Sequence, residues 1–371
     1  MINTEAFYND LKQANMDFFV GVPDSLLQNL CACIKKNSPN SRNIIAANEG
    51  NAVAIAAGYH IASGNYGVVY MQNSGLGNTV NPLLSLADEE VYRIPMLLII
   101  GWRGQPGVHD EPQHVKQGKL TLPLLDTMQI AYEVLEEDYQ PQLKSACDYM
   151  RKTGRPFALV VKKGAFEAYK LPKEEPRFEI SREAALKTIL ENIEEDSFVV
   201  STTGKTSREI FEIREHRGEG HARDFLTVGS MGHTSSIALG MSLGSDKTIY
   251  CIDGDGSFLM HMGAAGITAQ NAGCNLKYII INNGAHESVG GQPTICLDIS
   301  IKKVLEACGF PLVTEAYTTD EIQRGIEALR EAPVCAAMII YVNQGSREDL
   351  GRPTISPENN KKEMMDLFLT R

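Results

Sequence analysis

The sequence predicts an α/β protein made of two doubly wound, mostly parallel sheets that follow one another along the chain. Short apolar, β-branched runs alternate with longer stretches that have helical periodicity. These runs are continuous rather than alternating, which is typical of parallel strands covered by helices on both faces. At 371 residues the chain is long enough for two domains of ordinary size.

The first half of the chain contains the elements of one such sheet. Apolar runs predict strands at residues 18–22, 43–47, 68–72, 96–101 and 157–162. Helical periodicity between these runs predicts helices at residues 5–15, 24–36, 50–63, 80–88 and 140–152.

A polar stretch separates the two halves. Residues 168–179 are mostly charged or polar and include two prolines, which predicts a linker between a domain at 1–167 and a domain at 180–371. After this stretch, apolar runs again alternate with helical stretches, and strands are predicted at 198–202, 225–228, 248–253, 278–282 and 336–342. We therefore expect two domains of the same class without a third domain between them.

Composition excludes several functional classes. The net charge of −11 argues against a nucleic-acid surface, which needs clustered Lys and Arg. No apolar run reaches the length of a membrane-spanning helix, and the polar N-terminal residues do not read as a signal peptide. The 8 cysteines show no metal-type spacing and lie mostly beside apolar residues, so we expect free buried thiols and a cytoplasmic protein.

Ligands of open α/β sheets bind beyond the carboxyl ends of the strands, so polar residues directly after apolar runs are the informative ones. One run leads into Gly254-Asp255-Gly256-Ser257, with a helix expected near Phe258, and the next run ends in Asn282-Asn283. The 28 positions from Asp255 to Asn283 fit one crossover helix and a return strand. A carboxylate and an amide oxygen at neighbouring strand ends suit Mg²⁺, although GDG alone is equally typical of a tight turn.

This combination of GDG and a later NN resembles the thiamine-diphosphate enzyme family. The resemblance implies thiamine diphosphate and Mg²⁺ as cofactors. It also implies that the side chains of Asp255 and Asn283 and the carbonyl of Ala285 bind the metal, and that the Gly254–Ser257 loop, with Gly254, Gly256 and Ser257, contacts the diphosphate. The spacing is one residue longer than in many members.

Two further positions match that family. Glu49 follows an apolar run and opens an Ala-rich helix, where a carboxylate is also expected simply for its favourable interaction with the helix dipole. The resemblance makes Glu49 the glutamate that contacts the cofactor's aminopyrimidine and assists removal of the thiazolium proton. It makes Met231 the large aliphatic residue between the cofactor's two rings, whereas the sequence alone also allows a methionine of the core.

Three segments, at 21–27, 101–114 and 201–209, narrow the resemblance to the phosphonopyruvate decarboxylases and, more distantly, the sulfopyruvate decarboxylases. An anionic phosphonate or sulfonate needs cations or helix N-termini, so Arg103 and Lys205 are expected to bind substrate. The resemblance places the loop with Asp24 and Ser25 in the active site as well, and His109 and His114 are expected to be acid–base or orienting residues. Taken singly, such residues are more often solvated surface charges, structural histidines or helix N-caps.

The expected reaction is decarboxylation of phosphonopyruvate to phosphonoacetaldehyde and CO₂ in phosphonate biosynthesis. Sulfopyruvate or another 2-oxo acid is the alternative substrate, and a non-catalytic cofactor-binding subunit is the alternative of another class. The family also implies a homo-oligomer, at least a dimer, with active sites at subunit interfaces. Gly204-Lys205-Thr206 is not a P-loop, because residue 199 is Val rather than Gly.

Overall fold

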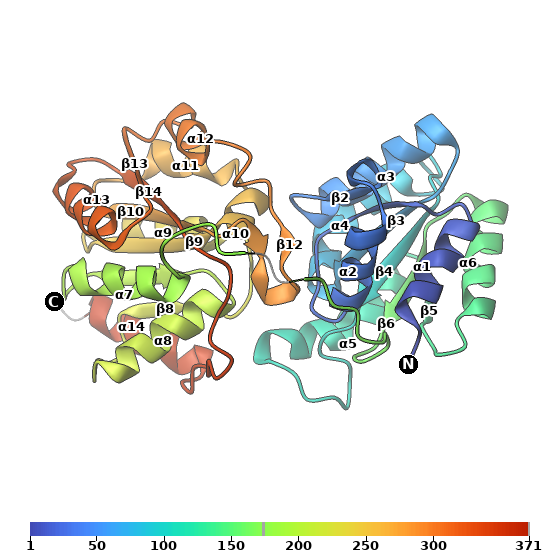
Figure 1. Cartoon of the computed structure of the whole chain (residues 1–371), viewed down its shortest axis with the longest axis horizontal. Coiled ribbons are helices and arrows are strands. Elements are labelled where there is room, and N and C mark those ends of the chain that lie inside the picture. The colour runs from blue at the N-terminus through green and yellow to red at the C-terminus, as the bar shows by residue number, and fades with distance from the viewer. Residues whose placement is uncertain (173–174, 370–371) are drawn as a thin grey trace. The chain divides into compact units, whose positions relative to one another are not determined.

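The computed structural model describes residues 1–172 and 175–369, and the chain in it divides into two compact units (Figure 1). The first unit contains residues 1–173 and 288–292, and the second contains residues 174–287 and 293–371. The expected linker, 168–179, spans this division, and its residues 173 and 174 lie outside the described part of the chain.

The first unit is built on a six-stranded sheet with strand order β2-β1-β3-β4-β6-β5. Neighbouring strands pair in parallel, as the continuous apolar runs predict. The strands are β1 (Phe18–Gly21), β2 (Asn43–Ile45), β3 (Gly67–Gln72), β4 (Met96–Gly101), β5 (Ala131–Val134) and β6 (Phe157–Val161).

Helices cover both faces of this first sheet, so its central strands are buried on both sides. One face packs against α1 (Thr4–Gln13), α2 (Gln28–Asn37) and α6 (Gln140–Thr153). The other face packs against α3 (Glu49–Ser63), α4 (Leu76–Pro82) and α5 (Pro112–Thr127).

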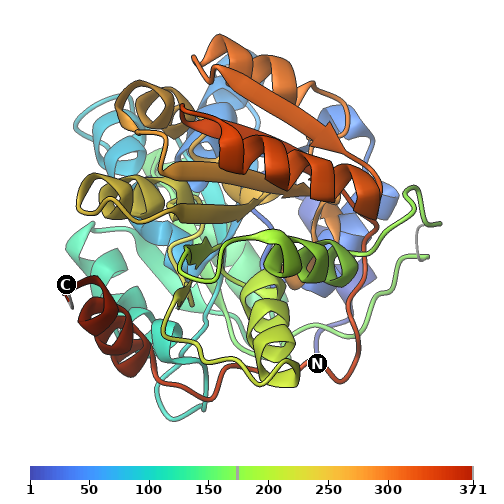
Figure 2. The same cartoon turned by 90° about the vertical axis from the view of Figure 1, so that its left-hand side faces the viewer.

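The second unit repeats this architecture with strand order β13-β14-β10-β9-β7-β8 (Figure 2). Its strands are β7 (Phe198–Ser201), β8 (Asp224–Leu226), β9 (Ile249–Gly254), β10 (Leu276–Asn282), β13 (Leu312–Ala316) and β14 (Ala336–Tyr341). Helices α7 (Arg182–Asn192), α8 (Lys205–His216) and α13 (Thr319–Glu331) cover one face. The other is covered by α9 (Thr234–Leu243), α10 (Asp255–Met260), α11 (Ala264–Asn271), α12 (Ile301–Ala307) and α14 (Pro357–Leu369). A short pair, β11 (Ala285–His286) and β12 (Gln292–Pro293), follows β10.

The fold class is confirmed, but several elements differ from the sequence-based expectations. Strands β5 and β13 were not predicted; both are edge strands without a continuous run of buried side chains. The helix expected at 80–88 is instead α4 followed by a π-helix, Leu83–Ala87. Helix α10 begins at Asp255 rather than near Phe258, so this carboxylate lies in the first helical turn.

The cysteines are free, and five of them (Cys31, Cys33, Cys251, Cys296 and Cys335) are buried, whereas Cys274 is exposed. No helix in the described ranges combines the length and the apolar character needed to cross a membrane.

Candidate active site

The residues predicted to bind a metal follow two adjacent central strands of the second sheet. Strands β9 and β10 pair in parallel, with Ile280 opposite Asp253 and Ile281 opposite Gly254. Asp255 and Asn283 therefore emerge next to each other at the carboxyl edge, where ligands of open α/β sheets bind. The structure thus brings the GDG and NN segments together.

Asp255 is a buried carboxylate, with 3% of its surface exposed. Burial raises its pKa to about 7, although a hydrogen bond from Thr294 Oγ1 to its Oδ2, 2.5 Å long, opposes this effect. None of the ion pairs formed within the described ranges involves Asp255. A buried carboxylate without a cationic neighbour is unfavourable unless a cation compensates it.

Two hydrogen bonds fix the amide of Asn283. Its Nδ2 donates to Glu287 Oε2 at 2.9 Å, and its Oδ1 accepts from the Ala285 backbone N–H at 3.0 Å. The neighbouring Asn282 is turned into the fold instead, donating to the carbonyl of Cys296 at 2.9 Å. Asn283 is thus the asparagine of the pair that lies at the sheet edge with a defined orientation.

This donor set suits a hard cation. Across residues 1–172 and 175–369, no three His, Cys, Asp or Glu side chains converge in a way that could hold a metal ion. A site here would use one carboxylate, one amide oxygen and a backbone carbonyl, namely those of Asp255, Asn283 and Ala285. Such oxygen ligands, with few carboxylates and the remainder supplied by water and phosphate, are typical of Mg²⁺.

The loop that carries Met231 packs against the GDG turn. A Cβ atom added at Gly256 would lie 3.3 Å from Met231 Cε and 2.7 Å from the buried ring of His286. The backbone around Met231 is tightly turned, with positive φ at Ser230 (57°) and Gly232 (87°), and the N–H of Gly232 donates to Ser257 Oγ at 3.1 Å. Met231, Gly256 and Ser257 therefore form one contiguous surface in the second unit.

Glu49 occupies the corresponding edge of the first sheet. It opens α3, is 5% exposed and accepts a hydrogen bond from Asn78 Nδ2 to its Oε2 at 2.7 Å. Its other carboxylate oxygen lies over Gly75, where an added Cβ would come within 2.1 Å of Oε1. Only glycine at position 75 leaves room for this carboxylate.

Arg103 connects the substrate residues expected in the first unit. It forms a two-point ion pair with Asp110, with Nε 2.8 Å from Oδ2, and its Nη1 donates to Ser25 Oγ at 2.8 Å. Buried Asp24 accepts from Gln72 Nε2 at 2.6 Å and from the Leu26 N–H at 3.0 Å. Asp24 therefore stabilises the turn after β1 and is not a helix N-cap, since α2 begins only at Gln28.

The two histidines assigned to acid–base chemistry lie in different surroundings. His109 is exposed in the loop that precedes α5. His114 is 8% exposed within α5, and its buried Nδ1 has no hydrogen-bond partner. Burial, together with the nearby charge of Arg103, lowers the pKa of His114 to about 4, so this imidazole is neutral near pH 7.

Lys205 belongs to a charged cluster in the second unit. Its Nζ lies 3.0 Å from Glu287 Oε1, and Arg182 contacts both Glu287 and Glu209. Burial alone would raise the pKa of Glu287, but Arg182 and Lys205 hold it below its ordinary value. Each cation expected to bind substrate, Arg103 or Lys205, therefore has a carboxylate partner already.

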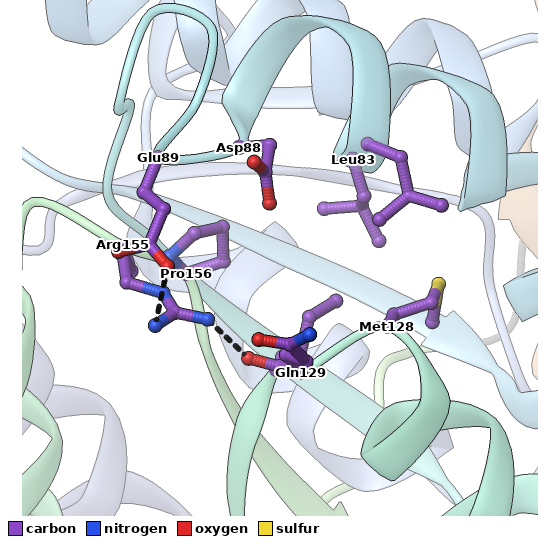
Figure 3. Close-up of a pocket in the computed structure, with 9 residues that line it drawn as sticks. Leu83, Asp88, Glu89, Met128, Gln129, Arg155 and Pro156 are labelled. Carbon is purple, nitrogen blue, oxygen red and sulfur yellow. Dashed lines mark hydrogen bonds and ion pairs between the residues drawn. The ribbon is translucent and has the colours of Figure 1, made fainter.

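A pocket in the first unit is lined by none of these residues, and Figure 3 shows its lining, which includes Leu83, Met128 and Arg155. Its residues Ile130 and Pro156 immediately precede β5 and β6, at the amino ends of the strands. Arg155 in this pocket donates to the carbonyl of Gln129 at 2.6 Å and pairs with Glu89 at 3.0 Å (Figure 3). These groups satisfy one another, which is typical of a structural contact.

Several residues of the two edges were not predicted. Gln72 is the last residue of β3 and Asn73 directly follows it, so the rule that polar residues at strand ends are informative could have found them. The same rule would not have found three other residues, because they do not directly follow a strand of the main sheet. Arg182 reaches the site from the start of α7, and Glu287 and Thr294 reach it from the segment after β10.

Comparison with known proteins defines the class to which this fold and site belong. The thiamine pyrophosphate enzyme, N-terminal TPP binding domain, matches residues 2–130, and the thiamine pyrophosphate enzyme, C-terminal TPP binding domain, matches residues 202–340. The chain belongs to the thiamine-pyrophosphate-dependent decarboxylase family. Thiamine pyrophosphate is the same compound as thiamine diphosphate.

Within that family, the similarity is to phosphonopyruvate decarboxylases. The chain is 32% identical to the phosphonopyruvate decarboxylase of Streptomyces viridochromogenes, over 91% of this chain and 87% of that protein. It is 31% identical to that of Streptomyces hygroscopicus, over 96% and 92%. A sulfopyruvate decarboxylase from Methanosarcina acetivorans is 28% identical, over 86% and 87%.

Proposed function

We propose that this protein decarboxylates phosphonopyruvate to phosphonoacetaldehyde and CO₂, as a step of phosphonate biosynthesis in the cytoplasm. The observation that carries the proposal is the placement of Asp255 and Asn283 at adjacent strand ends, in a chain similar to phosphonopyruvate decarboxylases along almost its whole length. The free cysteines suit a reducing compartment.

Asp255, Asn283 and the carbonyl of Ala285 would hold Mg²⁺, and the Gly254–Ser257 loop would hold the diphosphate. Bound thiamine diphosphate supplies the nucleophilic carbon and the electron acceptor that decarboxylation of a 2-oxo acid requires. Glu49 would hold the aminopyrimidine ring and exchange a proton with its nitrogen. Its fixed position over Gly75 and beside Asn78 supports this role.

The phosphonate would be bound by hydrogen-bond donors as well as by charge. A guanidinium has five N–H donors, and Arg103 uses three of its own on Asp110 and Ser25, so two remain for a ligand. Ser25 and Arg103 are held together by their own contact, and Asp24 fixes the turn that carries Ser25. Lys205, in the second unit, is the other cation proposed for the substrate anion, and neutral His114 would donate or accept a hydrogen bond without adding charge.

The activity is tested by measuring aldehyde formation from phosphonopyruvate, sulfopyruvate and pyruvate, each with thiamine diphosphate and Mg²⁺. We expect phosphonopyruvate to have the largest kcat/KM. We also expect chelation with EDTA to abolish turnover and added Mg²⁺ to restore it, because the metal ion would bridge Asp255 and Asn283 to the diphosphate.

A preference for sulfopyruvate would leave the proposed cofactor site unaffected. It would contradict phosphonopyruvate as the substrate. Activity that survives removal of all divalent metal would contradict the role of Asp255 and Asn283. Saturable cofactor binding with no CO₂ release from any of these acids would favour a non-catalytic subunit.

A homo-oligomer with active sites between subunits is part of this proposal. Helix α3 exposes an apolar stripe on the side opposite its buried face, and Ile61 in that stripe is 71% exposed. In the second unit, Leu243 of α9 and Ile267 of α11 are 63% and 62% exposed. Such apolar faces on packed helices are typical of subunit interfaces. The α3 stripe comprises Ala54, Ile55, Gly58, Ile61 and Ala62.

Sedimentation of an Ile61→Glu variant tests this interface. A charge on the stripe would have to be buried in the oligomer, so we expect dissociation to a smaller species and a loss of activity that higher protein concentration reverses. The matched control is Leu120→Glu on α5, which is 47% exposed but outside the stripe and should leave the assembly unchanged. An Ile61→Glu variant that sediments like the wild type would exclude α3 from the interface.

A further inference from the structure

Arg182 lies at the centre of a charged cluster in the second unit. Arg182 is 4% exposed and its guanidinium binds two carboxylates. Its Nε and Nη2 contact Glu209 at 2.6 and 2.8 Å, and its Nη1 contacts Glu287 Oε2 at 2.7 Å. Glu209 alone would neutralise this arginine in a two-point pair. Glu287 is therefore a second, largely buried carboxylate on the same arginine, and its other contacts indicate what it does.

Glu287 faces the metal-site asparagine. The same oxygen that accepts from Arg182, Glu287 Oε2, also accepts from Asn283 Nδ2 at 2.9 Å. Lys205 Nζ holds the second oxygen, Oε1, at 3.0 Å. Both carboxylate oxygens are thus engaged, and Glu287 is held in one position against Asn283 by cations from α7 and α8.

An amide can bind a cation only through its oxygen, so its orientation decides whether Asn283 is a ligand. With Nδ2 against the Glu287 carboxylate, Oδ1 is directed to the Ala285 N–H, 3.0 Å away. The reversed amide would place Oδ1 against a carboxylate oxygen and Nδ2 against an N–H donor. Both contacts of the observed orientation would then be lost.

We infer that Glu287, fixed by Arg182, is a positioning residue that holds the Asn283 amide with its oxygen available to the metal ion. This inference rests on the proposed function, since it concerns the metal site that the proposal assigns to Asn283. It adds a role for two residues that touch neither the metal nor the substrate in the proposal. Residues that orient metal ligands typically change metal affinity about 10- to 100-fold when they are replaced.

The test compares Glu287→Gln with Glu209→Gln, because each removes one carboxylate from the same arginine and only the first removes the contact with Asn283. Mn²⁺ binding is followed by its electron paramagnetic resonance signal in the presence of saturating thiamine diphosphate. We expect Glu287→Gln to raise the Mn²⁺ dissociation constant about 10- to 100-fold. We expect Glu209→Gln to leave the constant close to that of the wild type.

Thermal unfolding of the metal-free proteins shows whether each variant folds, and Glu287→Asp provides a second variant that keeps the negative charge beside Arg182. Its shorter side chain should also weaken Mn²⁺ binding. For Glu287→Gln, turnover should recover towards the wild-type kcat at saturating metal, which a damaged fold would not allow.

Unchanged Mn²⁺ affinity in Glu287→Gln would overturn the inference, and so would an equal loss in both variants, which would indicate a purely structural cluster. A wild-type protein that binds Mn²⁺ but does not decarboxylate phosphonopyruvate would contradict the proposed substrate. The comparison of Mn²⁺ affinities would then still decide the role of Glu287.

Discussion

Replacement of Glu49 by Gln is expected to lower kcat by about 10²- to 10⁴-fold, the usual contribution of a positioned acid–base group. Gln has the same shape and can keep the hydrogen bond from Asn78 through its oxygen, so the fold of the first unit should be unaffected. It cannot exchange a proton as a carboxyl group does. Cofactor affinity should therefore change little while turnover is largely lost.

The measurement is kcat together with the thiamine diphosphate dissociation constant, each determined for the variant and the wild type. A second change tests the same carboxylate without altering it. In Gly75→Ala the new Cβ would lie 2.1 Å from Glu49 Oε1 and must displace it, whereas Gly77→Ala adds a Cβ in open space. Turnover should fall only in the first of these two variants. Near-wild-type turnover in Glu49→Gln would remove Glu49 from the mechanism.

Replacement of Asp255 by Asn is expected to abolish metal-dependent activity without destabilising the metal-free protein. A metal ligand contributes several kcal/mol to catalysis, so kcat/KM should fall by about 10³-fold or more. The metal-free protein should unfold at the same temperature or higher, because the change removes a buried carboxylate that has no cation partner within the described ranges. Asn Oδ1 can still accept the hydrogen bond from Thr294.

Calorimetric unfolding with and without Mg²⁺ and thiamine diphosphate separates these two effects. The wild type should gain stability from the ligands and Asp255→Asn should not. The control is Asp253→Asn, which affects a buried carboxylate that accepts from Tyr278 Oη and the Gly254 N–H and should lower the unfolding temperature of the metal-free protein. Ligand-induced stabilisation retained in Asp255→Asn would show that the metal binds elsewhere.

The parts of the site that the sequence predicts are those whose position follows from strand order. Strands β9 and β10 are continuous buried runs, so their ends can be located and their polar successors, Asp255 and Asn283, recognised. Glu49, at the start of α3, was assigned from the resemblance, because a carboxylate in a first helical turn is also expected for its interaction with the helix dipole. Edge strands β5 and β13 lack a fully buried run and were missed, whereas the edge strand β2, which is also only partly buried, was predicted from its apolar run.

Contacts made by long side chains could not be predicted in this way. Arg182 and Glu287 are 105 residues apart, and nothing in either segment marks the other as its partner. Arg103 and Asp110 are only seven residues apart, but their pairing depends on how the loop after β4 turns back. Hydrophobic periodicity predicts where a helix or strand lies. The position of the charged group at the end of a long side chain depends instead on tertiary packing.

The division of the strands along the chain affects how the protein can fold during synthesis. All six strands of the first sheet lie before residue 162, and all six of the second lie after residue 197. The first sheet can therefore form during synthesis, before the ribosome has made any strand of the second sheet. Two sheets built from similar apolar parallel strands could otherwise exchange partners, and sequential completion removes that competition. Only residues 288–292 of the first unit are made late, and they contribute no strand to its sheet.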